Sequence, residues 1–143
     1  MKTITSTNAV LILTVESLYP NGVEISKFAT DSAFATSELG LAETRMGVDG
    51  KLAAGYTPQE IPLNINLEAD SPSYDVMANI MEKQQLNKTL YEVTAQISIP
   101  ALKKEFTLER GVLKSGHPFS DAKKVLDPTQ WGFVFESFHS SSL

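Results

Sequence analysis

The sequence contains no cysteine and only two histidines among its 143 residues. Without cysteine the chain can form no disulfide bond, no thiolate metal site and no cysteine nucleophile. Its longest apolar run near the N-terminus, residues 9–13, is far shorter than the ~20 residues of a membrane-spanning helix, and shorter than the apolar part of a signal peptide. We therefore expect neither export nor membrane insertion.

Basic residues are also few, with 12 Lys and Arg against 17 Asp and Glu and a net charge of −5. They gather only as two pairs, Lys103-Lys104 and Lys123-Lys124. A protein that wraps nucleic acid needs clustered cations to displace counterions from the phosphates. Tight binding of nucleic acid is therefore not expected.

The residue types that carry catalysis form no recognisable motif. His117 and His139 lack the spacing of a metal site, and the glycines lie in turns instead of opening a helix as a phosphate-binding loop does. Glu68 and Asp70 could be an acid/base or cation-binding pair, but helix N-terminal electrostatics explain them better. We expect a protein that is not an enzyme and that uses no cofactor and no metal.

The composition that remains is typical of one folded domain over residues 1–143, with 42% hydrophobic and 20% charged residues. In 60–68 every second residue is Ile or Leu, and 91–99 repeats this period of two, which predicts strands with one buried face. Further strands are predicted at 9–18, 104–113 and 129–138, the last with Trp131, Phe133 and Phe135 on one face. Asn21-Gly22 predicts a hairpin turn, and the tail 139–143 is expected to be flexible.

One helix is well signalled, at about residues 71–86, where Ser71 suits the N-cap and Pro72 the first helical position. A second short helix is possible at 120–126. The fold class is therefore mainly β: an antiparallel β-sandwich or partial barrel with one flanking α-helix.

A second hairpin, at about residues 41–58, is polar, contains glycine and has few large core residues. We expect it to project from the body and to have a partner, together with a polar N-terminal arm at residues 2–8. The strands 60–68 and 91–99 also carry continuous polar rows opposite their apolar faces. Such a row is either an ordinary solvated face or the lining of a wet channel built by several copies.

The order of these features resembles the tail tube proteins of contractile-tailed bacteriophages, which are related in fold to the type VI secretion tube protein. The resemblance rests on the first hairpin, ETRMGVDGKLAAGYTP leading into IPLNINLEADSPSYDVM, the single helix, Glu109-Arg110-Gly111-Val112-Leu113 and the closing TQWGFVFESF. It implies a hexameric ring in which four strands per subunit join neighbours into an inner β-barrel. Stacked rings would form the inner tail tube, a conduit for DNA ejection, with an acidic lumen along which DNA slides.

The resemblance also implies partners and a location. The partners are further copies in the hexamer and its stack, a surrounding tail sheath protein, the baseplate and tail terminator proteins, and a tape measure protein and later genomic DNA in the lumen. The location is the phage tail of the virion, after assembly in the host cytoplasm. Alternatives are a baseplate tube-initiating protein, a secretion-system tube protein, or a monomeric β-barrel that binds a small ligand.

Strand alternation then assigns residues to these roles. The candidates for the lumen face are Glu60, Asn64, Asn66, Glu92, Thr94 and Gln96. The candidates for ring stacking, on the projecting hairpin, are Arg45, Asp49, Lys51 and Tyr56. A register error of one residue would exchange inward and outward faces.

Overall fold

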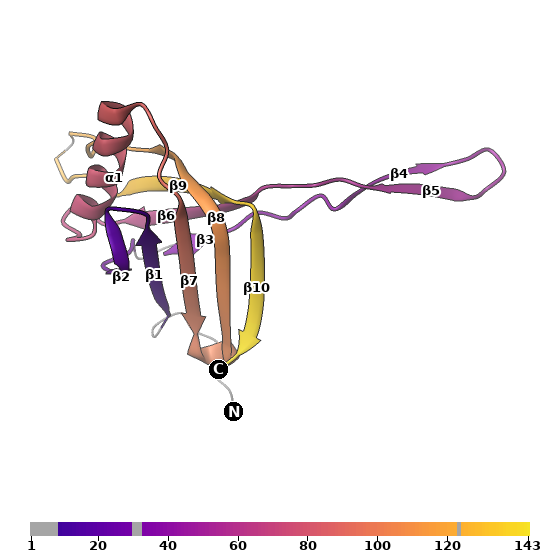
Figure 1. Cartoon of the computed structure of the whole chain (residues 1–143), viewed down its shortest axis with the longest axis horizontal. Coiled ribbons are helices and arrows are strands. Elements are labelled where there is room, and N and C mark those ends of the chain that lie inside the picture. Colours follow the sequence, from indigo (N-terminus) through magenta and orange to yellow (C-terminus); the bar gives the residue numbers. More distant parts are fainter. Residues whose placement is uncertain (1–8, 30–32, 123) are drawn as a thin grey trace.

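The computed structural model describes residues 9–29, 33–122 and 124–143 (Figure 1). The N-terminal arm expected at residues 2–8 lies outside these residues. The elements in chain order are β1 (Val10–Val15), β2 (Tyr19–Ile25), β3 (Phe34–Ala35), β4 (Ala42–Met46), β5 (Leu52–Tyr56), β6 (Ile61–Leu67), α1 (Tyr74–Asn87), β7 (Val93–Ile99), a 3₁₀ turn (Pro100–Leu102), β8 (Lys104–Gly116), β9 (Thr129–Phe135) and β10 (Ser137–Ser142).

Eight of these strands form one antiparallel system in the order β2-β1-β7-β8-β9-β6-β3, with β10 also paired to β8. The long strand β8 belongs to two layers. Its first half pairs with β7 and β10 in sheet A (β2-β1-β7-β8-β10), and its second half pairs with β9 in sheet B (β8-β9-β6-β3). Sheet A runs vertically in Figure 1 and sheet B crosses it horizontally. The described strands do not close into a barrel, and the predicted antiparallel fold with one helix is confirmed.

The core lies between the two sheets, as the alternation predicts. In β6 every second residue from Ile61 to Leu67 is buried, and β7 repeats this with Val93, Ala95 and Ile97. The three aromatic side chains of β9, at positions 131, 133 and 135, are all at most 2% exposed. The apolar faces of both sheets therefore make one continuous core.

Strand β8 passes from one sheet to the other at Arg110-Gly111. Arg110 has a positive φ of 55°, and the pairing with β7 gains one extra residue on β8 here. This β-bulge turns the strand, because an unpaired residue bends the bulged strand and increases its twist. Gly111 is buried, and a Cβ on it would lie 2.7 Å from the carbonyl oxygen of Val134. A residue without a side chain is therefore needed where the two sheets meet.

The helix α1 covers one end of the sandwich. Met77 and Ile80 are fully buried in the core, and the ring of Tyr74 packs edge-on against Trp131 with centroids 6.1 Å apart. The helix begins three residues later than predicted, at Tyr74, and Ser71 lies in the turn before it, where its Oγ accepts from the Ser73 backbone N–H (3.2 Å) and donates to the Ser26 carbonyl (2.6 Å). Strand β2 is thereby tied to the start of α1.

Three further predictions differ from the structure. The first hairpin turns at 16–18, where Ser17 has φ 68°, whereas Asn21-Gly22 lie inside β2 in a bulge opposite β1. The described residues of 120–126 form no helix, since Val125 and Leu126 find no surface to pack on and stay more than half exposed. The tail expected to be flexible is strand β10 as far as Ser142, because the edge of β8 offers it a full row of backbone partners.

Candidate functional site

The strands β4 and β5 pair only with each other in a two-stranded ribbon that projects from the body (Figure 1). The turn at its tip is held by the Lys51 backbone N–H, which donates to Asp49 Oδ1 at 3.1 Å, and Gly50 there has φ 81°. Every residue of both strands is exposed. An isolated two-stranded hairpin is at best marginally stable in water, so this ribbon is a surface in need of a partner.

The two faces of the ribbon differ in chemistry. Cross-strand pairing places Ala42 beside Tyr56, Thr44 beside Ala54, and Met46 beside Leu52, all on the face that we call the ribbon's apolar face. The opposite face carries the charged side chains of Glu43 and Arg45 opposite Gly55 and Ala53.

The four residues predicted for ring stacking are therefore not one group. Arg45 lies on the charged face and Tyr56 on the apolar face, while Asp49 and Lys51 belong to the turn. The apolar side chains Met46 and Leu52 were missed by the sequence analysis, although their alternation along 42–56 could have shown them.

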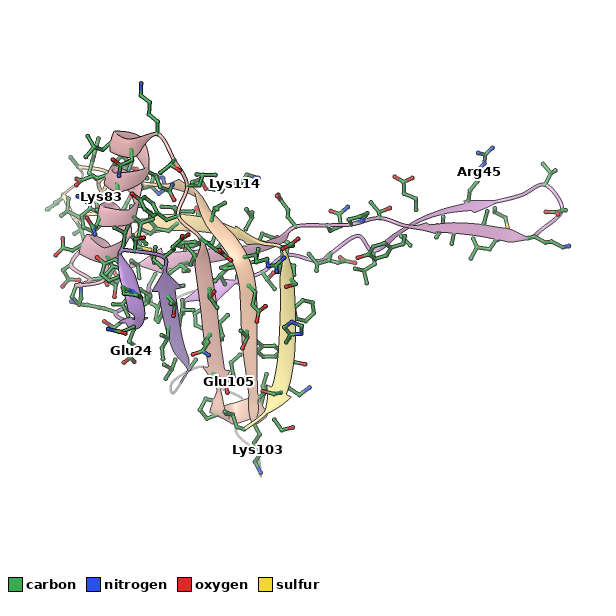
Figure 2. All side chains as sticks on the ribbon, viewed as in Figure 1. Glu24, Arg45, Lys83, Lys103, Glu105 and Lys114 are labelled. Atoms are coloured by element: carbon green, nitrogen blue, oxygen red, sulfur yellow. The ribbon has the colours of Figure 1, made fainter. Side chains whose placement is uncertain are left out.

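The outer face of sheet A carries polar and acidic side chains. Thr94 and Gln96 point outward, because their neighbours Val93, Ala95 and Ile97 are buried in the core. By register the outward positions continue across Glu105, Thr107 and Glu109 of β8, Ser137, His139 and Ser141 of β10, and Val10, Ile12, Thr14 and Glu24 of β1 and β2. Figure 2 shows Glu24 and Glu105 on strands of sheet A and Lys103 at the lower end of this sheet, while Lys83, Lys114 and Arg45 lie on α1, on the second half of β8 and on the ribbon. None of these described outward positions is a lysine or an arginine.

The predicted lumen residues divide between two faces. Asn64 and Asn66 lie on the outer side of sheet B, beside Gly132 and Gln130 of β9. Since the core separates the outer faces of sheets A and B, these two residues cannot share a surface with Thr94 and Gln96. Of the remaining candidates, Glu92 is exposed just before β7, and Glu60 forms an exposed ion pair with Lys114 (3.2 Å) just before β6. The six candidates for the lumen face therefore lie on more than one face of the subunit, and which of these faces lines a lumen stays a prediction.

The carboxylates of sheet A come mostly from residues that the sequence analysis did not select. Glu105 and Glu109 alternate with the apolar Phe106 and Leu108, a signal that could have found them. His139 could not have been found in this way, because the segment that contains it pairs with β8 only in the folded chain.

An apolar groove opens between the two sheets, and we call it the end groove. Its volume is about 350 Å³. Its walls come from β7 and β8 of sheet A, from β6 of sheet B, and from the segment that leads to the ribbon. The lining residues are Phe34, Ala35, Thr36, Ser37, Leu39, Ile61, Leu63, Ile97, Ile99, Phe106, Leu108 and Phe138.

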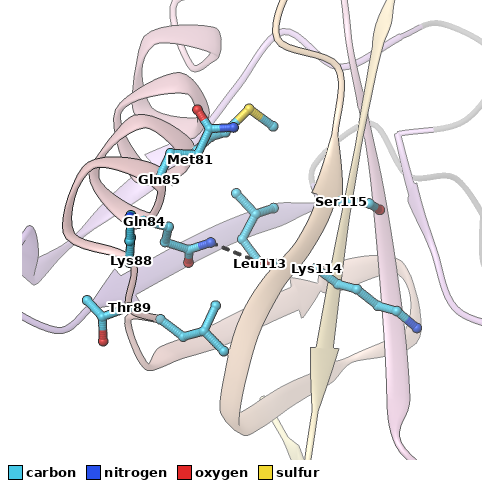
Figure 3. Close-up of a pocket in the computed structure, with 9 residues that line it drawn as sticks. Met81, Gln84, Gln85, Lys88, Thr89, Leu113, Lys114 and Ser115 are labelled. Atoms are coloured by element: carbon cyan, nitrogen blue, oxygen red, sulfur yellow. Dashed lines mark hydrogen bonds between the residues drawn. The ribbon is translucent and has the colours of Figure 1, made fainter.

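A second, more polar pocket of about 320 Å³ lies between the end of α1 and strand β8 (Figure 3). Gln84 Nε2 donates to the Leu113 carbonyl at 3.3 Å, and its Oε1 is buried without a hydrogen-bond partner among the described residues. Lys88 and Lys114 are among the residues that line this pocket, and the side chain of Lys114 extends away from Gln84 in Figure 3.

The described residues contain no cluster of three or more His, Asp or Glu side chains that could hold a metal ion. No helix among them has the length and the apolar character needed to cross a membrane.

The sequence model of a family described as tail fiber protein gp32 matches residues 2–139. No curated protein matches the sequence of this chain.

Solved structures share the fold at low sequence identity. The tube-terminating cap of the anti-feeding prophage is 9% identical with a TM-score of 0.60, over 100% of this chain and 93% of its own. The sheath/tube terminator of the PVC extracellular contractile injection system is 11% identical with a TM-score of 0.59, over 99% of both chains. A chain of the anti-feeding prophage baseplate is 10% identical with a TM-score of 0.58, over 99% of this chain and 97% of its own. The predicted tail-tube-like fold is confirmed.

Proposed function

The chain belongs to the tail fiber protein gp32 family, and we propose from that premise that it is a structural protein of a phage-like tail. In this proposal the subunits form hexameric rings that stack into the inner tail tube, through which DNA is ejected into the host. The tube is assembled in the host cytoplasm and remains in the tail of the virion. The role is mechanical, and the chain is not an enzyme.

The outer face of sheet A is the observation that carries this proposal. Its described outward positions combine hydroxyl and amide groups with Glu24, Glu105 and Glu109, besides Val10, Ile12 and His139, and they include no lysine or arginine. The outer face of sheet A would repel DNA phosphates weakly, because its carboxylates carry the same sign of charge. It would also bind the phosphates at none of these positions, because none of them supplies a cation to pair with the duplex. We therefore assign the lumen to the outer face of sheet A and the side away from the lumen to sheet B.

The edges of sheet A support assembly into a ring. Among the described strands, β2 and β10 each have one side without a backbone partner in the sheet. Exposed edges invite pairing with another chain, and a closed barrel removes them. Pairing of β2 in one subunit with β10 in the next would join the sheets into a continuous wall. The open edges also argue against a monomeric ligand-binding barrel.

The similar structures motivate the rest of the proposal, because they are tube, sheath, cap and baseplate parts of contractile particles. We therefore propose a surrounding sheath protein, a baseplate and a terminator as partners, and a tape measure protein and later DNA as transient contents of the lumen.

Electron microscopy of the purified protein at high concentration, with a mass measurement on the same sample, tests the assembly. Hollow tubes with six-fold symmetry would support the tube protein. Rings that do not stack would favour an initiating or terminating role at one end of a tube. A stable monomer at every concentration, also in the presence of baseplate, would refute the proposal and leave ligand binding in the end groove as the better hypothesis.

A matched pair of lysine substitutions tests the assignment of the lumen. Gln96→Lys adds a cation to the outer face of sheet A, and Asn64→Lys adds the same charge to sheet B. In assembled particles, Gln96→Lys should slow DNA ejection, and Asn64→Lys should leave it unchanged. The opposite result would place the lumen on sheet B.

A further inference from the structure

We infer that the apolar face of the ribbon in one subunit docks in the end groove of a second copy of this chain. The inference rests on the proposed stacking for the identity of the partner, and it adds the surface that receives the ribbon.

The ribbon needs a partner with an apolar surface. Met46 and Leu52 face each other across its two strands and are 65% and 63% exposed, and Tyr56 on the same face is 80% exposed. Water contact with such a row is unfavourable in proportion to its area. The charged Glu43 and Arg45 lie on the opposite face, so docking through the apolar face leaves both charges in solvent.

The end groove has the matching chemistry. Leu39, Ile99 and Phe106 in its walls are only partly buried, and Phe138 at its margin is 50% exposed. A space of about 350 Å³ accommodates a few side chains such as Met46 and Leu52, but not the whole ribbon. The groove would therefore take the apolar side chains near the tip, while the rest of the ribbon lies along its margin.

Strand β3 offers a backbone edge that would align the docked ribbon. Phe34–Ala35 form a wall of the groove and are the last strand of sheet B in the described order, so one side of β3 has no strand beside it. An incoming ribbon can add backbone hydrogen bonds along such an edge while its side chains enter a neighbouring pocket. Apolar contact would then supply affinity and strand pairing would set the register.

A second copy is the occupant that the shapes favour. The ribbon extends away from the body that bears the groove (Figure 1), and the exposure of all its residues shows that its own chain does not cover it. One chain thus carries a protruding apolar surface and a separate recessed one. Two different complementary patches on one molecule associate head to tail, which builds rings or open stacks instead of closed dimers.

Adjacent alanines on β5 provide a sharp test. Ala54 lies on the apolar face and Ala53 on the charged face, and Ser37 is an exposed small residue in the wall of the groove. Since the chain has no cysteine, Ser37→Cys, Ala54→Cys and Ala53→Cys each introduce a single thiol. Chains with Ser37→Cys are mixed with chains carrying either alanine variant, allowed to assemble, and treated with a short bis-maleimide.

Cross-linked dimer should form at least ~5-fold faster with Ala54→Cys than with Ala53→Cys, because neighbouring strand residues point to opposite faces. Equal rates, or no cross-link in samples that form normal assemblies, would overturn the docking inference and leave the proposed function standing. Failure of the unmodified chain to assemble under any condition would instead refute the proposed function, and with it this inference.

A second measurement reports whether the end groove is exposed to solvent. The dye ANS binds exposed apolar surface, so its fluorescence on the monomer should fall when subunits assemble. Ala54→Glu should block assembly and keep the dye signal high, while Ala53→Glu, the same change on the opposite face, should behave like the parent. If assembled protein binds as much dye as the monomer, the groove is open in the assembly, and a small ligand becomes its better occupant.

Discussion

Replacing Gly111 by alanine should strongly destabilise the fold, because this glycine lies where β8 passes between the sheets. An added Cβ would overlap the Phe135 ring, lying 2.5 Å from its Cε1 atom, and would sit 2.7 Å from the carbonyl oxygen of Val134. The ring cannot move away easily, since Phe135 is 2% exposed and stacks on Phe133 with centroids 6.3 Å apart. The oxygen belongs to the backbone of β9 and cannot rotate away.

The size of the effect follows from overpacking. Extra methylene groups in a packed core typically cost about 1–3 kcal/mol, and contact with backbone places this site near 3 kcal/mol. For a domain of this size, each kcal/mol lowers Tm by about 3–4 °C, so the variant should melt about 10 °C below the parent.

Thermal unfolding of the monomer by circular dichroism measures this loss, with Gly55→Ala as the matched control. Gly55 is exposed on the ribbon, and a Cβ there would meet nothing within 4 Å. Its replacement should change stability by less than about 0.5 kcal/mol. In addition, Phe135→Leu should be less damaging in the Gly111→Ala background than alone, because the smaller side chain relieves the overlap. A Gly111→Ala variant that melts with the parent would refute this account of the bend.

Two further predictions concern the start of α1. Ser73→Ala removes the acceptor of the Ser26 backbone N–H (2.8 Å), and urea unfolding should show a loss of about 0.5–1.5 kcal/mol, because this hydrogen bond is only partly buried. An unchanged midpoint would show that water replaces the bond. At Asp70, the hydrogen bond from Lys27 is the main cause that holds the pKa of the carboxyl below its usual 3.8. The pair therefore stabilises the fold above pH 3.8 and loses its contribution as the pH falls through the lowered pKa of Asp70. Asp70→Asn should slightly flatten this part of the acid unfolding profile, because the pair is exposed and its contribution is small. An acid unfolding profile identical to that of the parent would contradict the role of the pair.

The local pattern predicted the parts of the fold that depend on periodicity. In β6 alternate Ile and Leu residues face the core as predicted, and in α1 the buried Met77 and Ile80 are three residues apart, which places them on one face of the helix. The turn of the first hairpin was misplaced, because Asn21-Gly22 tolerates positive φ in a bulge as well as in a turn. Local residue preference does not distinguish these two uses.

The candidate surfaces were predicted only in part for a different reason. Alternation shows which residues of one strand share a face, so Asn64 was grouped correctly with Asn66, and Thr94 with Gln96. It does not show which sheets back onto each other, and the core proved to separate the two groups. The ribbon was located by its composition, but its apolar face became evident from the register of β4 against β5.

The amino-acid sequence alone thus determined that the chain is mainly β, which residues face the core, where the one helix lies and which segment projects. These properties follow from local spacing, because the period of a strand or helix is written in consecutive residues. Tertiary structure decided that β8 bends at Arg110-Gly111 to join two sheets, that the last residues pair as β10, and that an acidic wall and an apolar groove lie on different sides of the body. Those features depend on contacts between residues far apart in the chain, which no local pattern encodes.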